Sequence, residues 1–188
     1  GARAGILICY EAIFPEIISE LWEMVLWVGV FTEIRKQSWL SEDDMFVVNR
    51  YLDQLDIRGS DDIDNVFWRL ASMLDTAISE APALGTSGIL LGLDRFAFEQ
   101  TKTFILSSFE RSRKTFVILM DSLDDFQLDI DSVAHSLQGL LKLVGSMNKP
   151  RDLVDIRFCL PAEIYHRFIK VSSNPNKDFR RALRLEWT

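Results

Sequence analysis

The stretch Thr-Phe-Val-Ile-Leu-Met-Asp-Ser-Leu-Asp-Asp-Phe, residues 115–126, decides the fold that we expect for this chain. Residues 115–120 are apolar and of β-forming type, which predicts a buried strand of a parallel sheet. This strand brings Asp121 to its carboxyl end, and Asp124 and Asp125 follow in the next loop. Ligands of open α/β sheets bind at the carboxyl ends of strands, so the sequence predicts a site here.

The three carboxylates suit phosphoryl-transfer chemistry. A carboxylate at the strand end can hold Mg²⁺, which makes Asp121 the candidate metal ligand. A second carboxylate three or four residues on, Asp124 or Asp125, can orient or deprotonate an attacking water, and these are the candidate catalytic residues. A strand followed by aspartates is also typical of a chain that leaves a sheet through a solvated, helix-capping turn, and this alternative stays open.

Downstream of this stretch, the pattern predicts alternating helices and strands. We expect a helix from Asp129 to about Gly145, a strand at 154–160, a short helix from Pro161 and a third strand at 182–187. Strand, helix, strand, helix, strand is the order typical of a parallel α/β sheet.

Upstream, helical patterns dominate. The expected elements are a strand at 3–10, a helix at 16–36, a helix capped by Ser41 and stopped by Gly59, a helix after Ser60, and a helix at 96–113. The helix at 16–36 is apolar on most of its surface, which predicts that it is packed on several sides. Pro and Gly residues in 81–92 mark an internal boundary.

The chain divides by these patterns into three predicted segments. Residues 1–36 form a strand and helix of an α/β core, 37–95 a helical insertion, and 96–188 the rest of the core with the acidic strand. The fold class expected is therefore α/β and helix-rich, with a partial parallel sheet.

Residues 16–188 resemble P-loop ATPases of the STAND and AAA-related kind, and the specific part of the resemblance lies in 115–188. In that family, an apolar strand ending in Asp and followed by Leu-Asp-Asp is the Walker B element, which this chain carries at Asp121, Leu123, Asp124 and Asp125. The resemblance implies a P-loop NTPase sheet with ATP and Mg²⁺ as cofactors. It places a nucleotide-binding sensor at Arg157 in the next strand, where an ion-pair partner is the alternative reading.

The family's phosphate-binding loop is missing from the sequence. No Gly-x-x-x-x-Gly-Lys-Ser/Thr occurs among the 188 residues, so no backbone nest or lysine for the phosphates is present. We expect either that the loop lies upstream or that the chain does not bind ATP. The first hypothesis is a fragment of an ATPase that couples ATP to signalling or defence and is inactive alone. The second is a non-catalytic interaction domain that keeps the ATPase fold.

A third hypothesis comes from residues 5–16, Gly-Ile-Leu-Ile-Cys-Tyr-Glu-Ala-Ile-Phe-Pro-Glu. They resemble the nucleophile segment of the nitrilase superfamily, especially apolipoprotein N-acyltransferases. The resemblance implies an acyl hydrolase or transferase in which Cys9 attacks the acyl carbon. That family draws its Glu base and its Lys from positions before the cysteine, which this sequence does not include. A buried strand cysteine is the alternative.

Composition limits partners and location. The formal charge of −7 disfavours nucleic acid as a direct partner. No signal peptide or bilayer-length apolar stretch is present, so we predict a cytoplasmic chain without a membrane partner. The two cysteines are too few for a disulfide framework. The partners expected are a nucleotide, if the full domain is present, and proteins or further copies of the chain.

Overall fold

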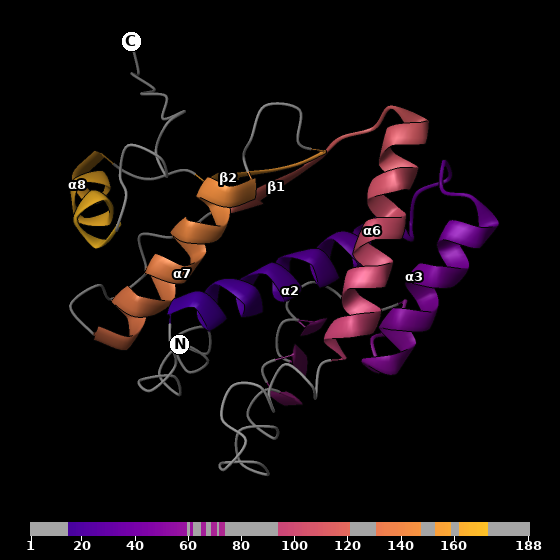
Figure 1. Ribbon diagram of the computed structural model, residues 1–188, viewed down its shortest axis with the longest axis horizontal. Helices are drawn as coiled ribbons and strands as arrows, with labels where there is room; N and C mark the ends of the chain where they lie inside the picture. Colours follow the sequence, from indigo (N-terminus) through magenta and orange to yellow (C-terminus); the bar gives the residue numbers. More distant parts are fainter. Residues whose placement is uncertain are drawn as a thin grey trace. The chain divides into compact units, whose positions relative to one another are not determined.

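The computed structural model describes residues 15–59, 61, 65–66, 69–70, 72–73, 94–120, 131–147, 153–158 and 162–172. Its helices and strands follow one another in the order α2 (Pro15–Ile34), α3 (Glu42–Gln54), α6 (Arg95–Ser112), β1 (Phe116–Met120), α7 (Asp131–Met147), β2 (Val154–Phe158) and α8 (Ala162–Val171) (Figure 1). The described part is thus helix-rich with a two-stranded parallel sheet, as expected from the sequence at this coarse level. The predicted strands at 3–10 and 182–187 and the boundary at 81–92 lie outside the described residues.

The chain forms two compact units. The helical unit takes in Glu20–Ile118 and Leu153–Asp155, and therefore holds most of α2, all of α3 and α6, and the first residues of both strands. The second unit takes in Gly1–Ser19, Leu119–Asp152 and Ile156–Thr188. It contains α7, α8 and the carboxyl ends of the strands.

Helix α2 is buried on several sides, which confirms the prediction from its apolar surface. Its buried side chains include Met24, Trp27, Val28, Val30, Phe31 and Ile34, which cannot all lie on one face of a helix. Thr32 is also buried, and its hydroxyl donates a hydrogen bond of 2.9 Å to the carbonyl of Val28. The buried Thr32 hydroxyl is therefore paired within the helix.

Helix α3 begins as the sequence predicts but ends earlier. The Ser41 hydroxyl accepts a hydrogen bond of 3.2 Å from the Asp44 N–H, and acidic residues fill the first turn. The prediction that Gly59 stops this helix is wrong. Asp56 adopts a left-handed conformation with φ of 52°, and the N–H of Ile57 donates a hydrogen bond of 2.8 Å to the Leu52 carbonyl. This pattern satisfies the last carbonyls of the helix before Gly59 is reached.

Hydrogen bonds define both ends of helix α6. The Asp94 carboxylate accepts from the Ala97 N–H at 3.1 Å and caps the start. At the other end Arg113 is left-handed, with φ of 51°, and the N–H of Lys114 donates to the Phe109 carbonyl at 2.9 Å. This turn ends α6 and leads the chain directly into β1.

Aromatic rings join the three helices of the helical unit. Phe31 of α2 contacts Tyr51 of α3 edge-on at 5.8 Å between ring centres, and lies 6.3 Å from Phe98 of α6. Tyr51 and Phe98 are themselves 6.2 Å apart, and Trp27 is 5.6 Å from Phe31. All four are buried, so this aromatic cluster is the core that fixes α3 and α6 on α2.

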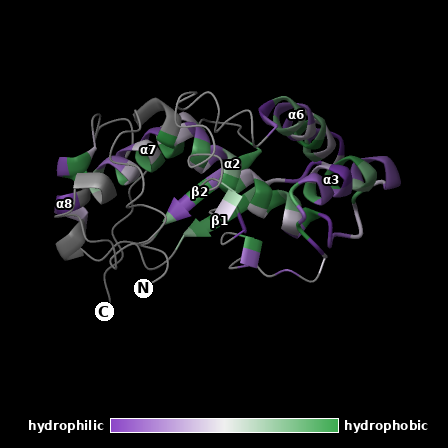
Figure 2. Ribbon diagram, turned by 90° about the horizontal axis from the view of Figure 1, so that it is seen from below, coloured by the Kyte–Doolittle hydropathy of each residue, from purple (hydrophilic) through white to green (hydrophobic). Residues whose placement is uncertain are grey.

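The two strands pair in parallel, and the Phe116 N–H donates to the Leu153 carbonyl at 2.8 Å. The prediction that residues 115–120 are buried is wrong for β1. Its side chains alternate between half-buried and exposed, and Leu119 is 77% exposed although the strand is apolar throughout (Figure 2). In the part of the chain that the structure describes, β1 pairs only with β2, and Val117 and Leu119 on one face of the strand are exposed.

The second unit is packed closely where α7 meets the start of α2. Gly139 of α7 lies against Ile18, and a Cβ added at Gly139 would be only 2.6 Å from Ile18 Cγ2. The buried side chains of α7 include Leu137, Leu140, Leu141 and Val144. Helix α8 contacts α7. No described helix is both long enough and apolar enough to cross a bilayer.

Candidate functional site

The carboxyl edge of the β1–β2 sheet is the site that the sequence predicts. Because the strands are parallel neighbours, their carboxyl ends lie at one edge. β1 ends at Met120, the residue before Asp121 in the sequence, and β2 ends at Phe158, one residue after Arg157. Arg157 is exposed near this edge.

The acidic residues of this site are not among those described. Asp121, Asp124 and Asp125 fall in the segment 121–130, and their roles stay predictions, as does the role of Cys9. Within the described ranges, no group of three or more His, Cys, Asp or Glu side chains lies close enough to hold a metal ion. The magnesium site is therefore a hypothesis about 121–130 alone.

A buried carboxylate links α3 to α6. Asp44 accepts a hydrogen bond of 2.6 Å from the Ser108 hydroxyl and one of 3.0 Å from the Arg111 guanidinium. Arg111 also donates to the Ser108 oxygen at 2.8 Å, which closes a three-membered network. Burial alone would raise the pKa of Asp44, but hydrogen bonds from Ser108 and Ser41 and the charge of Arg111 together hold that pKa below its usual value. The network keeps Asp44 ionised and clamps the two helices.

A lysine plays a similar role between α6 and α2. The Lys102 ammonium forms ion pairs with Glu23 of α2 and, at 3.4 Å, with Glu99 of its own helix. It also lies 5.7 Å from the ring centre of Phe98 and 6.0 Å from that of Trp27. The lysine charge is therefore neutralised by its neighbours, and this contact is a structural one.

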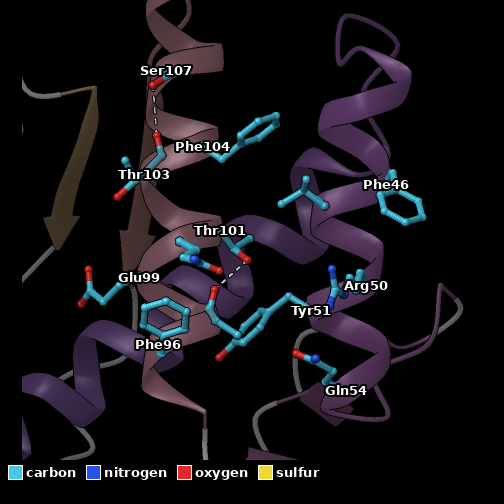
Figure 3. A pocket seen from close by; sticks show the side chains of 13 residues that line it. Phe46, Arg50, Tyr51, Gln54, Phe96, Glu99, Thr101, Thr103, Phe104 and Ser107 are labelled. Carbon is cyan, nitrogen blue, oxygen red and sulfur yellow. Dashed lines mark hydrogen bonds between the residues drawn. The ribbon is translucent and has the colours of Figure 1, made fainter.

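A groove between α3 and α6 opens on the surface of the helical unit (Figure 3). Its volume is about 680 Å³. Figure 3 shows Phe104 extending from α6 toward α3, with Phe46 and Arg50 on α3. The residues of α3 that line it are Phe46, Val47, Arg50, Tyr51 and Gln54, and those of α6 include Phe96, Glu99, Gln100, Thr101, Phe104 and Ser107.

The deepest lining residues belong to the core and are already satisfied. Tyr51 and Thr101 are buried, and the Thr101 hydroxyl donates to the Ala97 carbonyl at 2.8 Å. Burial, together with the nearby Asp94 charge, raises the pKa of Tyr51 well above its ordinary value, so this phenol stays neutral. These two residues therefore bring no charge to the groove near neutral pH.

Three phenylalanines at the rim of the groove are exposed to solvent. Phe46 is 67% exposed, Phe96 74% and Phe104 37%. Our reading of the sequence missed this surface because it followed only the buried stripe of each helix. The signal was present as a second stripe, with Phe46, Arg50 and Gln54 four residues apart on α3 and Phe96, Gln100 and Phe104 four residues apart on α6.

The comparisons with known proteins identify no relative of this chain. No family model, no curated protein and no solved structure matches this chain.

Proposed function

We propose that this chain is part of a P-loop-like ATPase of the signalling or defence type, to which it contributes the metal-binding and water-positioning strand end. The observation that carries the proposal is the β1–α7–β2 unit, two parallel neighbouring strands joined by a helix. In folds of this kind the ligand binds at the carboxyl ends of the strands, where the acidic run follows β1.

Each residue has a role in this proposal. Asp121 would coordinate Mg²⁺, and Asp124 or Asp125 would orient the attacking water. Arg157, exposed near the carboxyl end of the neighbouring strand, would contact the γ-phosphate of ATP. The phosphates need in addition a glycine-rich loop with its lysine, which the present sequence lacks, so we expect no hydrolysis by this chain alone.

The test is Mg²⁺-dependent ATP hydrolysis by the natural full-length protein that carries this sequence. Asp121→Asn should lower kcat on the order of 100-fold or more, because the metal loses a charged ligand. Asp53→Asn, an exposed aspartate of α3, is the control and should leave kcat unchanged. Unchanged hydrolysis in Asp121→Asn, or no binding of MgATP at millimolar concentration, contradicts the proposal.

The second candidate is a non-catalytic interaction domain that retains the ATPase fold. The exposed phenylalanines of the α3–α6 groove favour it, because apolar surface of this kind marks binding sites. Isothermal titration calorimetry separates the two candidates. A full-length protein that binds no MgATP but forms a complex through the groove supports the interaction domain.

A further inference from the structure

Exposed apolar side chains are concentrated at the α3–α6 groove. Of the five large apolar side chains exposed in the described part of the chain, three line it, namely Phe46, Phe96 and Phe104. An exposed phenylalanine is common by itself, but three around one hollow surface indicate a site that another apolar surface covers.

The charges on the two walls have opposite signs. Arg50 lies on the α3 wall, and its side chain makes no ion pair or hydrogen bond with any described residue. Glu99 lies on the α6 wall, where its 3.4 Å contact with Lys102 leaves 44% of the Glu99 side chain exposed. A two-fold axis that runs along the groove would place α3 of one copy on α6 of the other. Arg50 would then face Glu99 of the second copy, and the same pair would form twice.

We propose that the α3–α6 groove is a two-fold interface between copies of this chain. In the dimer, α3 and α6 of each copy form a four-helix arrangement, in which the exposed Phe46, Phe96 and Phe104 of both copies are covered and the Arg50–Glu99 pairs lie beside them. The charge pattern favours a second copy as the occupant, because the groove of that copy carries the charges that complement Arg50 and Glu99. This inference does not depend on the proposed ATPase function.

The size of the surface predicts a weak, reversible dimer. Helix α3 has 13 residues, which gives it a length of about 20 Å. Two adjacent helices are about 20 Å wide, so each copy offers a face of roughly 400 Å² and the dimer buries on the order of 800 Å². This area lies below that of stable complexes, so we expect the dimer to dissociate on dilution.

Sedimentation equilibrium between about 5 and 500 µM tests the proposal. The wild-type chain should pass from monomer to dimer over this range. Phe96→Asp should weaken the dimer at least tenfold, because it places a charge in the apolar contact between the copies. Phe96 is exposed and lies in the first turn of α6, where an aspartate suits the helix, so the variant should fold normally by circular dichroism. Leu119→Asp, an exposed apolar residue outside the groove, should leave dimerisation unchanged.

Charge reversal tests the two-fold geometry. Arg50→Glu and Glu99→Arg should each weaken the dimer about three- to tenfold, and the double variant should recover most of the loss because the pairs form again with exchanged signs. Glu110→Arg, an exposed position of the same helix, is the matched charge control. A chain that stays monomeric at 500 µM overturns the proposal and leaves the groove to a helix of another protein. Dimerisation that Phe96→Asp does not weaken, or that the double variant does not restore, overturns it as well.

Discussion

The α3–α6 pair and the β1–β2 pair each consist of two neighbouring segments, and they differ in how they are covered. In α3 and α6, side chains such as Leu52, Phe98 and Ile105 are fully buried. In β1 no residue is buried, and the apolar Val117 and Leu119 are exposed. Packing holds the helix pair in place, whereas the strand is held mainly by its hydrogen bonds.

This difference shows that apolar composition does not specify burial. The strand β1 is apolar at every position, yet alternate residues face away from the packed side. Helix α3 is more polar, yet it contributes Val48, Tyr51 and Leu52 to the core. Periodicity against a partner surface, and not mean hydropathy, decides which residues lose contact with water.

The largest expected effect is in the aromatic cluster. Phe31→Ala should lower the free energy of unfolding by about 3–5 kcal/mol, because Phe31 is fully buried among rings of three helices. Urea denaturation followed by circular dichroism measures this. Leu119→Ala, which shortens an exposed side chain of β1, should change stability by less than about 0.5 kcal/mol. Equal effects of the two substitutions would contradict the comparison.

The second effect concerns the polar clamp between α3 and α6. Asp44→Ala should lower the free energy of unfolding by about 1–3 kcal/mol, because Ser108 and Arg111 lose their acceptor. The exposed aspartate Asp53 on the same helix provides the control, and Asp53→Ala should have little effect.

The clamp also predicts a pH dependence. The pKa of Asp44 is lower in the folded chain than its ordinary value of 3.8. Its stabilisation is therefore complete above that value and is lost as the pH falls through the lower folded pKa. The stability difference between wild type and Asp44→Asn should be constant from about pH 5 to 7 and shrink below about pH 4. A difference that grows on acidification would show that the sign is wrong.

The third effect extends the comparison to the second unit. Gly139→Ala should lower the free energy of unfolding by about 1–2 kcal/mol, because the added methyl meets Ile18 at 2.6 Å and outweighs the better helix propensity of alanine. The same substitution in an Ile18→Ala background should cost less, because the contact with Ile18 Cγ2 is gone while the Cβ of residue 18 at 2.9 Å and the Ser19 nitrogen at 3.0 Å remain. Gly59→Ala, where nothing lies within 4 Å, is the control for a glycine without close neighbours.

The smallest effect is a gain in stability at the turn between α6 and β1. Arg113 has φ of 51°, a conformation that glycine adopts without strain. Arg113→Gly should therefore raise the free energy of unfolding by about 0.5–1 kcal/mol. Arg113→Ala should not, because it keeps the strained Cβ. Thermal melts of the two variants provide the measurement, and a gain with alanine would contradict this explanation.

Much of the local structure follows from short-range signals. Ser41 with its acidic neighbours predicts the start of α3, and the apolar run before Asp121 predicts β1. Helix α6, helix α7 and strand β2 also lie where their patterns place them. The end of α3 was predicted incorrectly because Asp56 adopts the left-handed conformation for which glycine is the usual signal.

The candidate sites were predicted less completely. The sequence places Arg157 near the carboxyl end of a strand beside the acidic one, and the parallel pairing agrees with this. The roles of Asp121, Asp124 and Asp125 stay predictions. The α3–α6 groove was missed because its walls are 42 or more residues apart along the chain, and no local pattern relates Arg50 to Glu99.

By itself, the sequence determined the kind and order of the described helices and strands, because caps, turns and periodicity act over a few residues. The tertiary structure alone decided which faces meet. It brought Asp44 to Ser108 across 64 positions of the chain, left one side of β1 exposed and placed three phenylalanines around one groove. Such contacts form where buried area and paired polar groups together outweigh the loss of chain entropy, and this balance belongs to the whole fold.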